Sequence, residues 1–312
     1  MAQVVLITGA RGYVGQRLFK YLFHKNNYSV FGTIRQGTAS DHLLPVDLNN
    51  LKEIHSVIQH LKPAQIYHIA GNIGGRHTTH DPQQIWADNL HATLNLYEAC
   101  LQASCRPRIL YLSSGAVYGE QPGELVETLP LLPKSIYAAS KAAADLASYT
   151  YFIQKGLPIL RVRLFNYLGP DLPASTALGR FIHELSRFHA EDTSNLELTV
   201  GNLSSERDYL DINDAITALT QLMEQGQPGE AYNLARGISK PMSWYLQQLT
   251  SMCAKSVRIL EDPHQLRHHD TFRLQVNIDK LSHTCSWKPA ISIEESLKNC
   301  MTAAVGKSPS NS

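Results

Sequence analysis

The chain has 312 residues, enough for about two domains, and its 43% apolar and 18% charged residues support a sizeable buried core. This composition excludes collagen-like, disordered and mini-protein classes. The 28 Lys and Arg residues nearly balance the 27 Asp and Glu residues, so the net charge of +1 indicates neither a nucleic acid nor an acidic membrane as a partner.

In the first half of the chain, short apolar runs alternate with longer segments of helical period. Strands are predicted at residues 4–8, 28–35, 46–48, 65–70, 108–113 and 158–165, and helices at residues 16–25, 51–61, 82–104 and 137–155. Such a βαβ pattern predicts an α/β fold: a Rossmann-like, doubly wound parallel sheet with helices on both faces.

After Phe165 the alternation loosens. A helix near residues 178–188 and a strand at 196–200 are predicted to belong to a smaller C-terminal α/β lobe that binds substrate. A helix at 211–225 and a strand at 231–234 return to the main sheet. We therefore predict a main domain of residues 1–165 plus about 206–236, a lobe of about 166–205 plus 237–305, and a disordered tail at 306–312.

Cysteine usage and the N-terminal residues indicate the compartment. The five cysteines include no C-x-x-C pair and no His at zinc-ligand spacing, so we expect free thiols and no metal site. His77 and His80 are expected to be loop residues. The apolar run at residues 4–7 is too short for a signal peptide, and no run approaches the roughly 18 residues that span a bilayer, so we expect a cytoplasmic protein.

The glycine pattern between the first strand and helix is typical of a dinucleotide-binding loop. Gly9 permits a tight turn, Gly12 lets the backbone approach a pyrophosphate, and Gly15 lets the helix pack closely on the strand. The N-terminus of the helix then offers amide donors to the anion. The loop residues assigned to the cofactor are Thr8, Gly9, Arg11, Gly12, Tyr13, Val14 and Gly15.

Arg35 ends the second strand, at the place where an NAD site has an acidic residue for the ribose 2′-hydroxyl. A guanidinium suits a 2′-phosphate, and Arg11 could join it, so NADP(H) is favoured and NAD(H) stays possible. Asp47 closes the third predicted strand and could accept from the adenine amino group, or it could cap the next helix.

Tyr137 and Lys141 are four residues apart, on one face of a predicted helix. A fixed positive charge near the phenol favours the phenolate and suits the tyrosine for acid–base chemistry. Ser114 lies at the end of a strand just upstream. Because the carboxyl ends of parallel strands meet at one edge of the sheet, we expect Ser114, Tyr137 and Lys141 to share the crevice of the glycine loop.

Together with Arg161-Val162-Arg163-Leu164-Phe165-Asn166 and Arg207-Asp208-Tyr209, these motifs make residues 4–297 resemble the extended short-chain dehydrogenase/reductases that act on nucleotide sugars. The resemblance implies that Ser114 holds the sugar oxygen, Tyr137 transfers a proton, and Lys141 lowers the tyrosine pKa and binds the nicotinamide ribose. It adds to the cofactor site Leu48, Ala70, Gly71, Asn89 and Leu164. It assigns to the nucleotide sugar Asn166, Arg180, Val200, Arg207 and Arg273. Asn277 departs from the family, which more often has Asp there.

Two small residues bear on the subfamily. The 4,6-dehydratases of this family carry an Asp-Glu or Ser-Glu pair where this chain has Gly115 and Ala116, and the epimerase-reductases that make GDP-fucose carry a cysteine at the second position. Neither elimination nor deprotonation beside the keto group is therefore favoured. The reaction that remains is hydride transfer at C4, by a 4-keto-sugar reductase or by a 4-epimerase with bound NAD. Arg35 and the local sequences around Ser114, Asn166 and Arg207 resemble those of the GDP-4-keto-6-deoxy-D-mannose reductases, which form GDP-D-rhamnose.

The resemblance also implies a homodimer, formed through a four-helix bundle of the helices at 82–104 and 137–155, and a nucleotide-diphosphate sugar as substrate. A protein that only senses NADP is a further alternative, but a binding protein has no need of the Ser114, Tyr137 and Lys141 triad.

Overall fold

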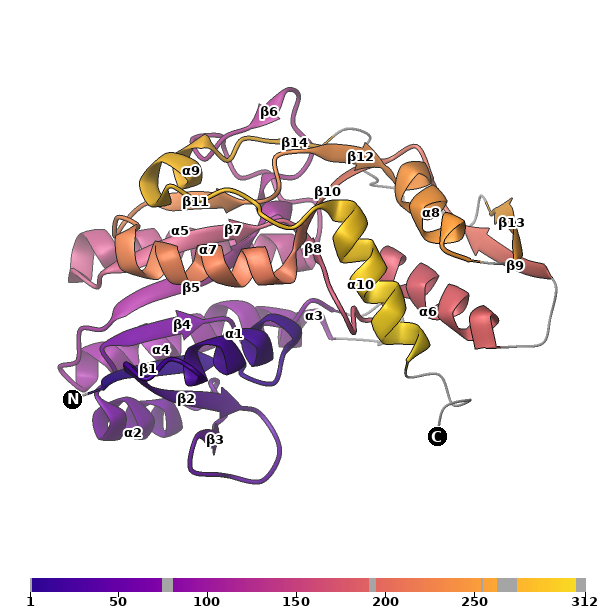
Figure 1. The fold of residues 1–312 in the computed structure, drawn as a ribbon. Coiled ribbons are helices and arrows are strands. Elements are labelled where there is room, and N and C mark those ends of the chain that lie inside the picture. The colour runs from indigo at the N-terminus through magenta and orange to yellow at the C-terminus, as the bar shows by residue number, and fades with distance from the viewer. Residues whose placement is uncertain (1, 75–80, 191–194, 254, 263–273, 307–312) are drawn as a thin grey trace.

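The computed structural model describes residues 2–74, 81–190, 195–253, 255–262 and 274–306. Its centre is a seven-stranded sheet with the order β11-β7-β5-β4-β1-β2-β3, in which every neighbouring pair is parallel (Figure 1). The strands are β1 (Gln3–Thr8), β2 (Tyr28–Ile34), β3 (Leu43–Pro45), β4 (Gln65–His68), β5 (Arg108–Ser114), β7 (Ile159–Leu164) and β11 (Ala231–Leu234). This order is the doubly wound Rossmann order with one strand added, as the sequence predicted.

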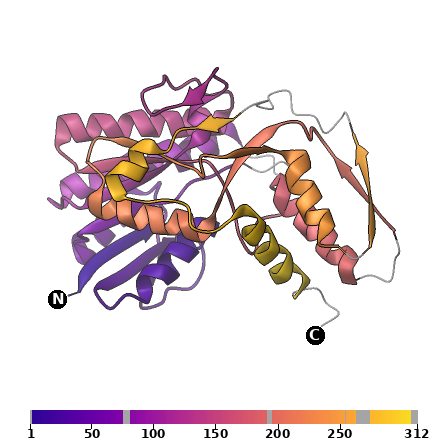
Figure 2. The ribbon, with the colours of Figure 1, turned by 45° about the horizontal axis from the view of Figure 1, so that its top comes forward.

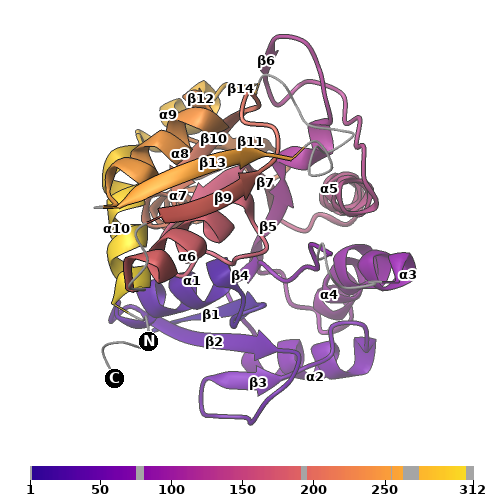
Figure 3. The ribbon, with the colours of Figure 1, turned by 90° about the vertical axis from the view of Figure 1, so that its right-hand side faces the viewer.

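Helices cover both faces of the sheet. One face carries α1 (Tyr13–Phe23), α7 (Ile212–Gln225) and α9 (Asp279–Cys285); the other carries α2 (Leu51–Leu61), α3 (Pro82–Trp86), the π-helical turn η1 (Ala87–His91), α4 (Ala92–Gln102) and α5 (Ile136–Lys155). Figure 3 shows α1 and α7 on one side of the sheet and α4 and α5 on the other.

Alternating side chains of the strands supply both hydrophobic cores. In β1, Val5 and Ile7 pack with α1 and α7, whereas Leu6 packs with α2 and α4, and all three are fully buried. Successive strand residues point to opposite faces, so a strand buried on both sides is a continuous apolar run. Helix α2 matches its predicted bounds and buries Ile54 and Ile58.

A smaller lobe lies beyond the carboxyl ends of the parallel strands (Figures 1 and 2). Its elements are β8 (Asn166–Leu168), α6 (Ala177–Ala190), β9 (Asn195–Val200), β10 (Glu206–Asp211), β12 (Ser239–Pro241), α8 (Met242–Ser251), β13 (Ser256–Glu261) and α10 (Ile293–Val305). Leu185, Leu246 and Leu297 belong to its separate hydrophobic core. A short helix η2 (Gly115–Tyr118) and the strand pair β6 (Glu124–Leu125) and β14 (Gln275–Val276) complete the described structure.

Several sequence predictions need correction. The third strand lies at Leu43–Pro45 and not at 46–48, so Asp47 follows the strand. Helix α1 begins at Tyr13 and not at residue 16, because the end of the glycine loop forms its first turn. The segment predicted as one helix at 82–104 contains the π-helical turn η1.

The strand at 231–234 does join the main sheet, beside β7. Leu281, Cys285 and Trp287, predicted in the lobe, pack instead into the core of the main sheet. The proposed domain boundaries otherwise stay a prediction, and the tail beyond residue 306 lies outside the described residues. In the described part of the chain no helix is long and apolar enough to cross a membrane.

Candidate active site

The glycine loop between β1 and α1 leaves no room for side chains. A Cβ at Gly9, whose φ is +72°, would lie 2.8 Å from the Cα atom of Ala70, and a Cβ at Gly15 would lie 2.1 Å from the Gly9 carbonyl oxygen. Gly12 is the N-cap of helix α1 and offers no side-chain cap, and the first turn of the helix has no acidic residue. Its first N–H groups lack intrahelical partners, so this cradle fits the pyrophosphate of a dinucleotide.

Four residues assigned to the cofactor have their side chains engaged elsewhere. Val14 and Leu164 belong to the core of the main sheet, and Leu48 packs on the opposite core. The Tyr13 hydroxyl donates to the Pro170 carbonyl oxygen at 3.0 Å. The buried side chains of Val14 and Leu164 leave their main-chain groups for a cofactor site, and the assignment of all four residues stays a prediction.

Arg35 follows β2 directly and keeps 58% of its side chain exposed, while one guanidinium nitrogen lies 2.5 Å from Asp88 Oδ1. The Arg11 guanidinium donates to the Gln36 carbonyl oxygen, so both arginines lie at the end of β2. Asp47 accepts from the Asn49 amide, and the cap of α2 is Asn50. The alternative of Asp47 as helix cap was therefore wrong.

Asp88, which the sequence did not single out, accepts hydrogen bonds from several side chains near the end of β2. Its fully buried carboxylate accepts from three side-chain amides besides the guanidinium of Arg35: those of Asn49, Asn72 and Gln84. Burial alone raises the pKa of Asp88, but these hydrogen bonds outweigh it and hold the pKa below its usual value. No local sequence signal marks Asp88, because polar residues recur throughout the segment at 82–104.

Asn89, beside Asp88 in the π-helical turn, clamps the loop that follows β4. Its side-chain oxygen accepts from the Asn72 amide at 2.7 Å, and its amide group donates to the Asn72 carbonyl oxygen and to Ser140 Oγ, both at 2.9 Å. This clamp fixes the loop containing Ala70 and Gly71. Both donors of Asn89 are used within the protein, where they position this loop; its contact with the cofactor stays a prediction.

Ser114, Tyr137 and Lys141 come together at the carboxyl end of β5. Ser114 hydrogen-bonds the Tyr137 phenol and accepts from the Ala116 amide at 3.2 Å. Lys141 Nζ donates to the Leu112 carbonyl oxygen at 2.5 Å. Ser135 caps α5 and thereby fixes the turn that carries the tyrosine.

The electrostatics of this triad differ from the prediction. Burial raises the pKa of Tyr137, although the hydrogen bond from Ser114 opposes the shift. Burial also lowers the pKa of Lys141 to about 7, against the attraction of Asp145 one turn later. Lys141 is therefore not a fixed positive charge in the protein alone, and the tyrosine stays protonated at neutral pH.

Asp145 joins this triad to the strand beneath it. Its buried carboxylate lies 3.0 Å from Arg161 and 3.1 Å from Arg163, both on β7. Burial raises its pKa, but the hydrogen bonds and charges of the two arginines dominate and lower it. Helix α5 is thus anchored to the sheet directly below Lys141.

The residues predicted to hold substrate lie around β8 and the lobe. Asn166 donates to the Asp208 carbonyl oxygen at 3.2 Å, and Arg180 donates to that of Thr199 at 3.0 Å. Arg207 lies on β10, the strand that pairs with β8. Val200 is fully buried in the lobe core, so its side chain cannot contact a ligand as predicted. Arg273 lies outside the described residues.

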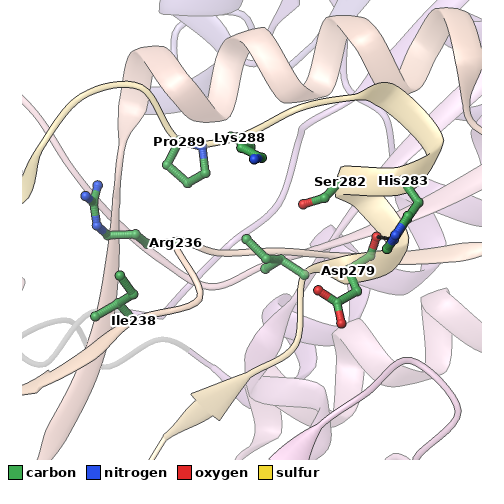
Figure 4. A pocket seen from close by; sticks show the side chains of 8 residues that line it. Arg236, Ile238, Asp279, Ser282, His283, Lys288 and Pro289 are labelled. Carbon is green, nitrogen blue, oxygen red and sulfur yellow. Dashed lines mark hydrogen bonds between the residues drawn. The ribbon is translucent and has the colours of Figure 1, made fainter.

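A pocket of about 540 Å³ lies elsewhere, beside α9 (Figure 4). Arg236 and Ile238 lie on one side of it, and Asp279, Ser282 and His283 on the other. None of the residues assigned to cofactor or substrate lines it. The part of the chain that the structure describes holds no cluster of metal-ligating side chains, and its five cysteines are free thiols; His77 and His80 lie outside that part.

Comparisons with known proteins agree with this fold. The profile of the NAD dependent epimerase/dehydratase family matches residues 5–235. GDP-6-deoxy-D-mannose reductase of Pseudomonas aeruginosa is 29% identical over 302 residues, 96% of each chain. UDP-glucuronate 4-epimerase of Thermodesulfobacterium geofontis is 27% identical over 94% of this chain and 93% of its own. The solved structure of RMD from Pseudomonas aeruginosa complexed with NADPH has a TM-score of 0.85 at 27% identity, covering 98% of this chain and 100% of that one.

Proposed function

The chain belongs to the NAD dependent epimerase/dehydratase family and is an NAD(P)-dependent oxidoreductase, and from this premise we propose that it reduces the C4 keto group of a nucleotide-linked 4-keto-6-deoxyhexose with NADPH. The observation that carries the proposal is the meeting of Ser114, Tyr137 and Lys141 at the carboxyl end of β5, with the exposed guanidinium of Arg35 at the end of β2. Arg35 provides the positive charge that a 2′-phosphate requires.

Elimination chemistry is disfavoured by the packing of η2. A Cβ at Gly115 would lie 2.4 Å from the Phe165 ring, so this position has no room for the acidic side chain that dehydratases use. The next residue, Ala116, is exposed but has no acid, base or nucleophile. The substrate we propose is GDP-4-keto-6-deoxy-D-mannose, reduced to GDP-D-rhamnose or its C4 epimer, in keeping with the name of the Pseudomonas aeruginosa relative.

When bound, the nicotinamide supplies the hydride that reduces C4. Tyr137 donates its proton to the C4 oxygen, and its raised pKa keeps that proton in place at neutral pH. Ser114 accepts from the Ala116 amide and hydrogen-bonds the Tyr137 phenol, so its hydroxyl lies beside the proton donor and would donate to the same oxygen once the substrate is bound. Lys141, between the loop after β4 and the phenol, holds the nicotinamide ribose and supplies positive charge when protonated.

The second candidate is a nucleotide-sugar 4-epimerase, favoured by the likeness to the UDP-glucuronate 4-epimerase. An epimerase oxidises and then re-reduces its substrate, so it needs tightly held NAD and consumes no NADPH. The state of the cofactor in the purified protein therefore separates the two candidates.

We would incubate the purified protein with GDP-4-keto-6-deoxy-D-mannose and NADPH and follow the loss of reduced nicotinamide, with NADH and a dTDP-4-keto sugar in parallel. The proposal expects stoichiometric loss of NADPH with the GDP sugar. Interconversion of a sugar nucleotide without added cofactor would identify a 4-epimerase, and failure of both reactions would remove both candidates.

We also propose that the protein is a homodimer through α4 and α5. Leu146, Tyr149 and Ile153 follow one another at helical spacing on α5 and are 57%, 45% and 60% exposed. An apolar stripe of this kind is typical of a helix that packs against a partner. The cytoplasmic location stays a prediction.

A further inference from the structure

A continuous chain of buried hydrogen bonds runs beneath the site, from the cofactor loops to the catalytic helix. On the cofactor side, the Ala70 main-chain amide bonds to Thr8 Oγ1 (3.2 Å), and Thr8 Oγ1 bonds to His68 Nδ1 (2.7 Å). On the other side of the ring, His68 Nε2 bonds to Thr93 Oγ1 (2.9 Å), which bonds to the Asn89 carbonyl oxygen (2.7 Å). The Asn89 side-chain amide then bonds to Ser140 Oγ (2.9 Å), and Ser140 Oγ bonds to the Tyr137 carbonyl oxygen (2.8 Å). Each of the five side chains in this chain is at most 1% exposed.

The direction of every bond in the chain follows from the groups at its ends. The Asn89 carbonyl oxygen can only accept, so the Thr93 hydroxyl donates its proton to that oxygen. Thr93 Oγ1 must therefore accept from His68 Nε2–H. A neutral imidazole has one N–H, so Nδ1 must accept the proton of the Thr8 hydroxyl. Thr8 Oγ1 in turn accepts from the Ala70 amide.

This pattern admits one state of His68, the neutral ring protonated at Nε2. A second proton at Nδ1 would face Thr8 Oγ1 and leave the threonine proton without its acceptor. Burial without a carboxylate partner, together with the positive charge of Lys141, lowers the pKa of His68 to about 3, so the ring stays neutral at physiological pH. The phenol of Tyr111, whose ring lies 5.8 Å away, adds no charge there.

Each half of the chain serves a different part of the site. Thr8 ends β1 and holds the Ala70 amide, so it joins the glycine loop to the loop after β4. Thr93, through Asn89 and Ser140, reaches the first turn of α5, which carries Tyr137. Among the residues that the structure describes, His68 is the side chain that hydrogen-bonds both threonines.

We propose that His68 is a positioning residue that ties the cofactor loops to the catalytic helix through its Nε2–H tautomer. This inference rests on the proposed function for its kinetic consequences, but the tautomer itself does not depend on the reaction. Neither motif that identified the site includes His68, which is the fully buried last residue of β4.

The direct test is nitrogen NMR of the protein labelled at histidine, with the His68 signals assigned by comparison with His68→Gln. We expect one protonated and one unprotonated ring nitrogen, with Nε2 bearing the proton, unchanged between about pH 5 and 8. A proton on Nδ1, or titration of the ring within that range, would overturn the proposal. This result is obtained whether or not the protein reduces a keto sugar.

The kinetic test uses Thr8→Val and Thr93→Val, which remove one hydroxyl on each side of His68. We expect each variant to lower kcat/KM about tenfold, Thr8→Val mainly through a higher KM for NADPH and Thr93→Val mainly through a lower kcat, because either change also loosens the imidazole that the other half shares. Thr220→Val is the matched control, because Thr220 is a buried helical threonine that donates only to its own helix.

The double variant Thr8→Val, Thr93→Val should fall short of the product of the single effects, because either change releases the ring. Equal losses of kcat/KM in Thr220→Val, or single effects that multiply exactly in the double variant, would refute the positioning role. The hydrogen bonds of His68 would then contribute only to core packing. If the wild-type protein lacks reductase activity, the proposed function fails, while the NMR experiment still decides the inference about His68.

Discussion

Replacing Lys141 by methionine is expected to stabilise the cofactor-free protein while abolishing its activity. The buried ammonium has a pKa of about 7, against 10.5 for an ordinary lysine. At about 1.4 kcal/mol for each pH unit, the difference corresponds to an upper limit of about 5 kcal/mol of destabilisation below pH 7. The lost hydrogen bond to the Leu112 carbonyl oxygen offsets about 1 to 3 kcal/mol of the gain.

The effect depends on pH with a definite sign. Between about pH 7 and 10.5 the unfolded chain holds the lysine proton and the folded protein does not, so unfolding takes up a proton and wild-type stability rises with pH. The advantage of Lys141→Met should therefore fall by roughly 2 to 3 kcal/mol between pH 6 and pH 9. Urea unfolding of both proteins across this range measures it. A difference in unfolding free energy that is constant, or that grows with pH, would refute the buried, shifted lysine.

Other single substitutions test separate parts of the account. Tyr137→Phe should leave NADPH binding intact and lower kcat by roughly 10²–10⁴, and unaltered turnover would exclude the tyrosine as the proton donor. Arg35→Ala should raise the KM for NADPH about tenfold or more and leave that for NADH nearly unchanged; a parallel rise for both cofactors would contradict its role with the 2′-phosphate. Ile153→Asp should convert the dimer to a monomer in light scattering, whereas a dimeric variant would place the interface elsewhere. Leu297→Ala, at a fully buried position of the lobe, should lower the unfolding free energy by about 2 to 5 kcal/mol, and a loss below about 1 kcal/mol would indicate that the lobe core relaxes around the change.

Local sequence signals predicted the parts of this fold that local physics determines. The glycine loop needs positive φ at Gly9 and close approach at Gly15, and few residue patterns permit both. The apolar stripe of helix α2 predicted its bounds, whereas the capping Asn50 and the left-handed end at Lys62 are seen only in the structure.

The third strand shows where such reading fails. Val46 is buried and Leu48 packs on the core, which gives residues 46–48 the apolar alternation of a strand. The ladder instead pairs Leu43, Leu44 and Pro45 with β2, and the Val46 amide makes one more hydrogen bond, to the Ile34 carbonyl oxygen of β2. A short edge strand carries too few residues for periodicity to fix its register.

Contacts between residues distant in sequence were beyond prediction in the candidate site as well. Arg35 was identified from its place at a strand end, but its ion pair with Asp88 joins residues 53 positions apart and depends on the π-helical turn. The pKa of Lys141 follows from burial, which an isolated Tyr-x-x-x-Lys motif does not report. His68 was predicted only as a strand residue, because its hydrogen-bond partners Thr8 and Thr93 are distant from it in sequence.

The most direct test of the central claim is the fate of the transferred hydrogen. NADPH carrying deuterium at C4 of the nicotinamide would be incubated with GDP-4-keto-6-deoxy-D-mannose, and the product examined by proton NMR. The account predicts one deuterium at C4 of the sugar for each NADPH consumed, with NADP released. Recovery of the 4-keto sugar unchanged, with the NADPH unconsumed, would contradict the reductase.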